Sequence, residues 1–174
     1  MLILAMDPSG SYNEGKGTTG YSVWVYNNLE YRLIQFGQLA ATDFKTKEEY
    51  WQSHIKLIQQ IEPDILVIED YLLYAHKAAQ QIGSKMETPK LIGIIEYECS
   101  KLNIEIVMQK AVDVKKRWND DILIWKGIIY KKGNHFYIDN TNISKHIRDS
   151  IRHGIHYIMK MKKKELKQND RWFN

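Results

Sequence analysis

Two short runs of consecutive apolar residues constrain the fold of this chain more than any other feature. Residues 2–6 and 65–68 are apolar throughout, and each run is followed directly by a carboxylate, Asp7 or Glu69. Uninterrupted apolar runs of this length are typical of strands buried on both faces of a sheet. Because ligands of open α/β sheets collect at the carboxyl ends of the strands, we expect Asp7 and Glu69 to lie near each other.

Three further segments have the composition of strands. Residues 21–26 and 31–36 are rich in aromatic and β-branched side chains, and residues 104–108 are mostly apolar. Asn27 and Asn28 are typical turn residues, so the first two of these segments are predicted to form a hairpin. The first three strands of the chain would then be antiparallel to one another.

Apolar residues recur at helical spacing in three segments, 46–61, 75–101 and 143–163. The second segment is expected in two pieces, because Pro89 suits the first turn of a new helix. The third carries isoleucines along one side, at positions 143, 147, 151, 155 and 158. Three strands followed by alternating helices and strands predict an α/β sandwich around a mixed sheet.

Residues 122–138 alternate apolar groups with Lys131, Lys132, Gly133 and Asn134, a pattern that predicts a β-hairpin. We place this hairpin in an insertion of about 119–140, before the last helix. A chain of 174 residues has the size of one domain, so residues 1–174 are assigned to a single domain.

The composition excludes several classes of protein. No apolar run approaches the roughly 20 residues that a membrane helix needs, so no membrane association is expected. The chain has one cysteine, Cys99, which excludes an internal disulfide framework and fits the reducing cytoplasm. We therefore expect a cytoplasmic protein.

Positive charge is concentrated in two segments. Residues 145–174 contain nine Lys or Arg against three acidic residues, and residues 110–134 contain seven against three. The net charge of the whole chain is only +4, so the remainder is acidic. Such a distribution is typical of proteins that bind a polyanion, although a solvated Lys-rich helix end would look similar.

Three polar residues of the last predicted helix share one ridge. His146, Asp149 and His153 are spaced three and four residues apart, and this ridge lies away from the isoleucine side. It could be the solvated face of a surface helix. Together with Asp7 and Glu69, however, the set favours a site for oxygen-preferring divalent cations such as Mg²⁺ or Mn²⁺.

Residues 10–18 nearly match a phosphate-binding P-loop. The hydroxyl residue that should follow Lys16 is replaced by Gly17, and a strand follows where a helix is needed. Nucleoside triphosphate binding through such a loop is therefore not expected. An ATPase of the sugar-kinase or actin type would share the opening strands, but that class usually needs two such domains and this chain has room for one.

Five short motifs, taken in order, resemble those of RuvC-type Holliday junction resolvases. They are Asp7-Pro-Ser-Gly with Thr19-Gly20-Tyr21, Val67-Ile68-Glu69, Lys90-Leu-Ile-Gly93, Ala111-Val-Asp-Val-Lys115-Lys116 and His146-Ile-Arg-Asp149-Ser150. The motifs extend over nearly the whole chain, and the ordered set is more specific than any member. The extra hairpin resembles an insertion in phage-encoded relatives.

The resemblance implies an α/β protein with the RNase H-like fold. Its five-stranded mixed sheet would have strands one to three antiparallel, strands four and five parallel to the first, flanking helices and the inserted hairpin. Asp7, Glu69, His146 and Asp149 would bind two divalent cations, Mg²⁺ or Mn²⁺. Lys115 would be a catalytic residue that approaches the DNA backbone at the cut.

The implied function is a metal-dependent endonuclease that resolves Holliday junctions by paired phosphodiester hydrolysis with two-metal catalysis. Its partner would be branched DNA, and paired cuts in a four-way junction suggest a homodimer. Residues expected to contact DNA are Lys115, Lys116, Arg117, Tyr71, Tyr74, Lys131 and Lys132.

Departures from the family pattern leave alternatives open. The family's wedge aromatic corresponds to Leu72 here, flanked by Tyr71 and Tyr74, and His146 stands where many members have Asp. An RNase H-type nuclease acting on RNA–DNA hybrids would share the carboxylates and the metals. A non-catalytic DNA-binding module would share only the fold.

Overall fold

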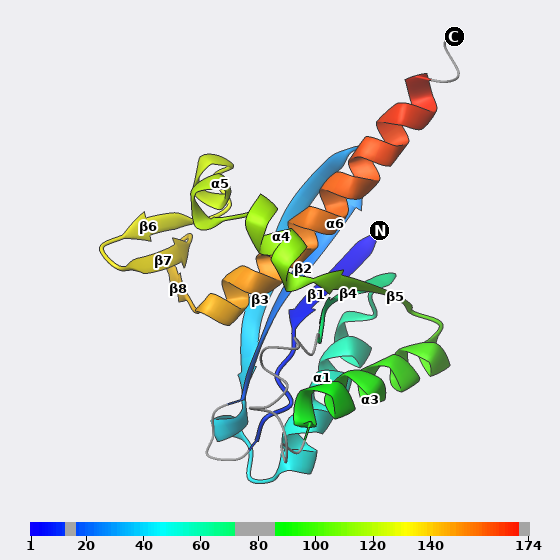
Figure 1. Ribbon diagram of the computed structural model, residues 1–174, viewed down its shortest axis with the longest axis vertical. Coiled ribbons are helices and arrows are strands. Elements are labelled where there is room, and N and C mark those ends of the chain that lie inside the picture. Colours follow the sequence, from blue (N-terminus) through cyan, green and yellow to red (C-terminus); the bar gives the residue numbers. More distant parts are fainter. Residues whose placement is uncertain (13–16, 72–85, 171–174) are drawn as a thin grey trace.

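A computed structural model describes residues 1–12, 17–71 and 86–170 (Figure 1). Its central sheet has five strands in the order β3-β2-β1-β4-β5. The strands are β1 (Leu2–Asp7), β2 (Thr18–Asn27), β3 (Glu30–Ala40), β4 (Ile65–Asp70) and β5 (Glu105–Lys110). Strands β1 to β3 are antiparallel, and β4 and β5 run parallel to β1. The predicted mixed sheet is confirmed.

Six helical segments accompany the sheet in the described ranges. They are the 3₁₀ turn η2 (Ala41–Asp43), α1 (Lys47–Ile61), α3 (Glu87–Leu102), α4 (Ala111–Arg117), α5 (Asp120–Trp125) and α6 (Lys145–Asp170). Pro89 lies in the first turn of α3, as predicted, while residues 75–85 lie outside the described ranges. Helix α6 continues beyond the predicted end at residue 163. No helix in the described ranges is long and apolar enough to cross a membrane.

The alternation of side chains along the strands creates two cores. On β1, Ile3 and Ala5 face the core beneath α6, whereas Leu4 and Met6 face the core beneath α1 and α3. Helices α1 and α3 lie on one side of the sheet and α6 crosses the other (Figure 1). By the same alternation, Asp7 continues the series that points toward α6.

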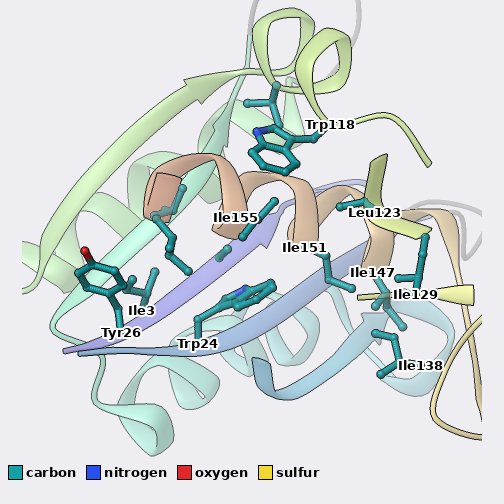
Figure 2. Packing of buried hydrophobic residues seen from close by; sticks show 14 of the residues in the cluster. Ile3, Trp24, Tyr26, Trp118, Leu123, Ile129, Ile138, Ile147, Ile151 and Ile155 are labelled. Atoms are coloured by element: carbon teal, nitrogen blue, oxygen red, sulfur yellow. The ribbon is translucent and has the colours of Figure 1, made fainter. Parts of the chain in front are cut away.

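Helix α6 packs closely on β2. Ile147, Ile151 and Ile155 lie in the core with Trp24 of β2 (Figure 2). A Cβ atom at Gly154 would come within 2.3 Å of the Trp24 Nε1 atom, so only glycine allows this approach. The isoleucine side predicted from the sequence is therefore a core face.

The insertion differs from the prediction in its first part. Residues 122–125 belong to α5, not to a strand, because Asn119 caps that helix by accepting from the Ile122 amide at 2.9 Å. The hairpin itself is present as β6 (Tyr130–Lys132) and β7 (His135–Ile138), and β8 (Thr141–Ile143) adds a third strand. Apolar residues of the insertion, among them Leu123, Ile129 and Ile138, pack beside Ile147 and Ile151 of α6 (Figure 2).

Candidate active site

The first turns of α6 lie over the carboxyl ends of β1 and β4. Gly20 of β2 pairs with Asp7, and a Cβ atom at Gly20 would come within 2.1 Å of the His146 backbone. Helix α6 therefore rests directly on the β2 backbone at this point. The contact places His146 beside Asp7, with 2.9 Å between the His146 Nδ1 and Asp7 Oδ2 atoms.

The Glu69 carboxylate is held in place by His153 of α6. The His153 Nε2 atom lies 3.0 Å from the Glu69 Oε2 atom, and its Nδ1 atom lies 3.0 Å from the Gln109 Oε1 atom. His153 is fully buried, and both of its ring nitrogens contact neighbouring side chains. Its observed role is to fix the Glu69 carboxylate, as second partners of this kind do around catalytic carboxylates.

Lys115 connects Glu69 with the third carboxylate, Asp149. Its Nζ atom lies 3.4 Å from the Glu69 Oε2 atom and 3.1 Å from the Asp149 Oδ2 atom. Asp149 is only 2% exposed, and its other oxygen accepts from Arg152. The solvated-face interpretation of the helix ridge is therefore wrong for Asp149 and His153, both of which are buried.

The titration behaviour of these groups reflects crowded negative charge. Burial raises the pKa of Asp7, and the nearby charges of Glu69 and Asp149 raise it further, against the hydrogen bond from His146. Burial alone would lower the pKa of Lys115, but Asp149 and Glu69 outweigh it and raise that pKa. For Glu69, the contacts with His153 and Lys115 outweigh burial and lower its pKa. A cation among the carboxylates is thus electrostatically favoured.

The side chains fit a divalent metal in their chemistry. Asp7, Glu69 and Asp149 offer hard carboxylate oxygens, and His146 adds one imidazole nitrogen, a donor set that suits Mg²⁺ or Mn²⁺. The Lys115 ammonium already lies between two of the carboxylates, which shows that positive charge is accommodated there. Within the described ranges, no three His, Cys, Asp or Glu side chains converge as a ready-made metal site.

The loop that follows Asp7 is fixed by the protein itself. The Ser9 amide donates to Thr19 Oγ1 at 2.9 Å, and the Tyr50 hydroxyl donates to the Ser9 carbonyl at 2.7 Å. Thr19 Oγ1 also contacts the Nε2 atom of buried His54 at 2.8 Å. These buried polar residues were not predicted from the sequence. Their hydrogen bonds hold the loop that follows Asp7 in place, and they do not form a phosphate-binding loop.

The predicted DNA-contacting residues lie on two elements near the site. Lys116 and Arg117 are exposed at the end of α4, while Lys131 and Lys132 are exposed on β6. Tyr71 is half-buried directly after β4, and Tyr74 lies outside the described residues. The insertion also exposes 81% of Trp125, with the Lys126 ammonium 5.1 Å from its ring.

A polar groove separates the insertion from the sheet edge near His146. It has a volume of about 540 Å³ and is lined by Phe36, Gly37, Gln38, His135, Thr141, Asn142, Ile143, Ser144 and Ile147. Hydroxyl and amide groups of this type commonly contact nucleic-acid phosphates. The groove is lined by residues of β3, of the insertion and of the start of α6, and by none of the carboxylates.

Sequence comparison places the chain in no known family, because no family model and no curated protein matches it. Solved structures do resemble it, among them RuvC and a viral Holliday junction resolvase. T. thermophilus RuvC in complex with a Holliday junction substrate has a TM-score of 0.61 at 14% identity, over 88% of this chain and 89% of that one. The fowlpox virus Holliday junction resolvase has a TM-score of 0.55 at 16% identity, over 92% and 99%. Its complex with substrate junction DNA has a TM-score of 0.51 at 15% identity, over the same shares.

These similarities establish the fold. The chain has the RNase H-like architecture, in the form found in RuvC-type resolvases, as the sequence motifs predicted.

Proposed function

We propose that this chain is a divalent-metal-dependent endonuclease that resolves Holliday junctions and related branched DNA by paired phosphodiester hydrolysis. The observation that carries the proposal is the Lys115 ammonium between Glu69 and Asp149, with Asp7 near enough for the charges of both carboxylates to raise its pKa. The carboxylates come from two strand ends and a helix of a resolvase-type fold. Buried carboxylates are unfavourable in a fold unless they bind cations, and nucleases use such sites for catalysis.

Four residues would hold two divalent cations, namely Asp7, Glu69, His146 and Asp149. Bound there, the cations would supply Lewis-acid activation of the scissile phosphate and of the attacking water. His153 and Gln109 keep Glu69 oriented through their hydrogen bonds. Lys115 is 39% exposed in its side chain, so its ammonium is free to exchange a carboxylate for a phosphate oxygen of the DNA.

The DNA would lie across the site between α4 and the insertion. Lys116 and Arg117 would contact the backbone on one side, and Lys131 and Lys132 on the other. Tyr71, beside Glu69, and Tyr74 are proposed to meet the branch point. Such backbone contacts provide affinity without sequence information. A homodimer would present two sites to the two-fold symmetric junction.

Cleavage of end-labelled substrates tests the proposal. A four-way junction, a flap, a linear duplex and an RNA–DNA hybrid would be incubated with the protein in Mg²⁺ or Mn²⁺. Symmetric paired nicks are expected in the junction. Asp7→Asn should reduce the rate by about 10³-fold or more, because it removes a charged ligand of the reacting site. Asp43→Asn, at an exposed position of η2, is the matched control and should cut like the wild type.

Other outcomes would change the assignment. Preferential cutting of the hybrid would identify an RNase H-type nuclease, and no cutting of any substrate would leave a DNA-binding module. Mn²⁺ should support activity at least as well as Mg²⁺, since the His146 nitrogen suits Mn²⁺ better. Replacing His146 with Asp should shift the preference toward Mg²⁺, and an unchanged metal preference would remove His146 from the ligand set.

A further inference from the structure

Arg152 of α6 connects the candidate site with the insertion. Its guanidinium is buried and contacts three partners on three different elements of the chain. The Nε atom donates to the Trp118 carbonyl at 2.8 Å, Nη1 donates to Asp149 Oδ1, and Nη2 donates to Asp120 Oδ1. A buried arginine with its donors matched in this way has little freedom to move.

The contact with Asp149 fixes which carboxylate oxygen faces the site. Arg152 holds the Oδ1 atom, and the Oδ2 atom is left 3.1 Å from the Lys115 ammonium, on the side of Glu69. The terminal torsion of an aspartate is broad, so the backbone alone does not determine this orientation. Arg152 determines it.

The contact with Asp120 brings the insertion into the same network. Asp120 is the first residue of α5, the helix with which the insertion begins. Its Oδ1 atom also lies 3.3 Å from the Arg148 Nε atom. The Arg148 guanidinium in turn lies 4.0 Å from the centre of the Phe136 ring of β7. Two arginines of α6 thus bind both the first helix and the second strand of the insertion.

We propose that Arg152 is a positioning residue for Asp149. Through its contact with Arg152, Asp120 couples the placement of the insertion to the geometry of the site. The proposal rests on the proposed function, because it takes Asp149 as a metal ligand. It assigns the insertion a role besides DNA contact, which is to control how the Asp149 carboxylate is presented. An insertion that shifts on binding DNA would change the site through the Asp120–Arg152–Asp149 chain of contacts.

Charge gives the direction of the expected effect. Arg152 now shares its positive charge between two carboxylates, Asp120 and Asp149. When Asp120 is neutralised, Asp149 becomes the only carboxylate of that guanidinium, and the surroundings of Asp149 become more positive by one charge. Both changes disfavour a further cation at Asp149. Asp120→Asn should therefore weaken metal binding although residue 120 does not contact the metal site itself.

Calorimetric titration of the DNA-free protein with Mn²⁺ tests this inference without relying on catalysis. Asp120→Asn should weaken Mn²⁺ binding by about three- to tenfold, a change of the size expected for loss of one nearby charge. Junction cleavage should slow by about tenfold, while the junction Kd measured in EDTA stays within about twofold of the wild type. Asp121→Asn removes an exposed charge from the same helical turn and is the matched control, with all three values unchanged.

A second variant separates positioning from folding. Arg152→Gln should weaken Mn²⁺ binding although it removes a positive charge, because the Asp149 carboxylate loses the contact that orients it. Asp120→Asn should have a smaller effect in that background than in the wild type, because its influence through Arg152 is gone. Additive effects, or an Asp120→Asn protein that binds Mn²⁺ like Asp121→Asn, would overturn the inference while leaving the nuclease intact. If the wild type neither binds Mn²⁺ nor cuts the junction, the proposed function fails and the inference with it.

Discussion

The two helices that cover opposite faces of the sheet bury very different side chains. Helix α1 buries Leu57, Ile58 and two titratable residues, Tyr50 and His54, that burial keeps uncharged. Helix α6 buries its isoleucines, but also Asp149, Arg152, His153 and His156. Buried charge destabilises a fold unless it is paired. The α6 face therefore carries buried charge that the α1 face does not, and part of it, Asp149, contacts the Lys115 ammonium that also contacts Glu69.

Histidine is used in two ways. On the α1 side, burial lowers the pKa of His54 to about 4, so this ring stays neutral and serves as a hydrogen-bonding partner of Thr19. On the α6 side, burial likewise lowers the pKa of His156 to about 4, whereas the hydrogen bond with Asp7 raises the pKa of His146. The α6 face thus differs from the α1 face in pairing a histidine with a carboxylate.

The largest expected contrast comes from two glycines. Gly20→Ala should lower the cleavage rate by about 10²-fold and destabilise the protein by roughly 1–3 kcal/mol, because its Cβ would force α6 away from β2. Gly93→Ala, in the exposed part of α3 where a Cβ meets nothing within 4 Å, should instead stabilise by about 0.5–1 kcal/mol. Urea unfolding and junction cleavage measure both. Equal behaviour of the two variants would remove the claim that α6 is fixed on the Gly20 backbone.

An effect of intermediate size is expected when the free energy of unfolding is measured at different pH values, because His54 of α1 is buried in its neutral form. The unfolded chain protonates His54 near pH 6.5 and the folded chain only near pH 4, so the unfolded state binds more protons between these values. The free energy of unfolding should therefore fall as pH falls from 6.5 toward 4, with His54 contributing roughly 3 kcal/mol of this loss. His54→Gln should lower stability at pH 7 and flatten that part of the profile, as urea unfolding at pH 7, 5.5 and 4.5 would reveal. An unchanged profile would place the pH sensitivity elsewhere.

The smallest effect is expected at the surface of the insertion. Replacing both Lys131 and Lys132 with Ala should weaken junction binding several-fold and reduce the slope of log Kd against log salt by up to about two. Lys45→Ala with Lys56→Ala removes the same charge from the α1 side and should change neither value. Fluorescence anisotropy at several salt concentrations makes the comparison. If the two double variants lost the same junction affinity, DNA would not prefer the insertion over the α1 side of the molecule.

The sheet could be predicted because each strand has a residue pattern of its own that is typical of strands. The runs that end in Asp7 and Glu69, and the aromatic hairpin with its turn at Asn28, depend only on neighbouring residues. Positive φ at Asn28 and Leu29 confirms the tight turn. The mistaken strand at 122–125 arose from weighing four apolar residues above the helix start signal of Asn119, Asp120 and Asp121.

The sequence indicated which residues belong to the candidate site, but it did not indicate how they contact one another. Motif order selected Asp7, Glu69, Asp149 and Lys115. The structure places Lys115 between Glu69 and Asp149, and Asp7 beside His146. The Arg152–Asp120 contact joins residues 32 positions apart on two helices, and no local pattern encodes it. The burial of His153 was likewise invisible, because the helical period does not reveal that the insertion and the sheet enclose α6 together.

Lys115 gives Glu69 and Asp149 a counter-ion that belongs to the chain. Many small metalloproteins unfold when a chelator removes their metal, because nothing else neutralises the ligands. Here an ammonium lies between two of the carboxylates without any bound ion, so we expect the protein to stay folded in EDTA.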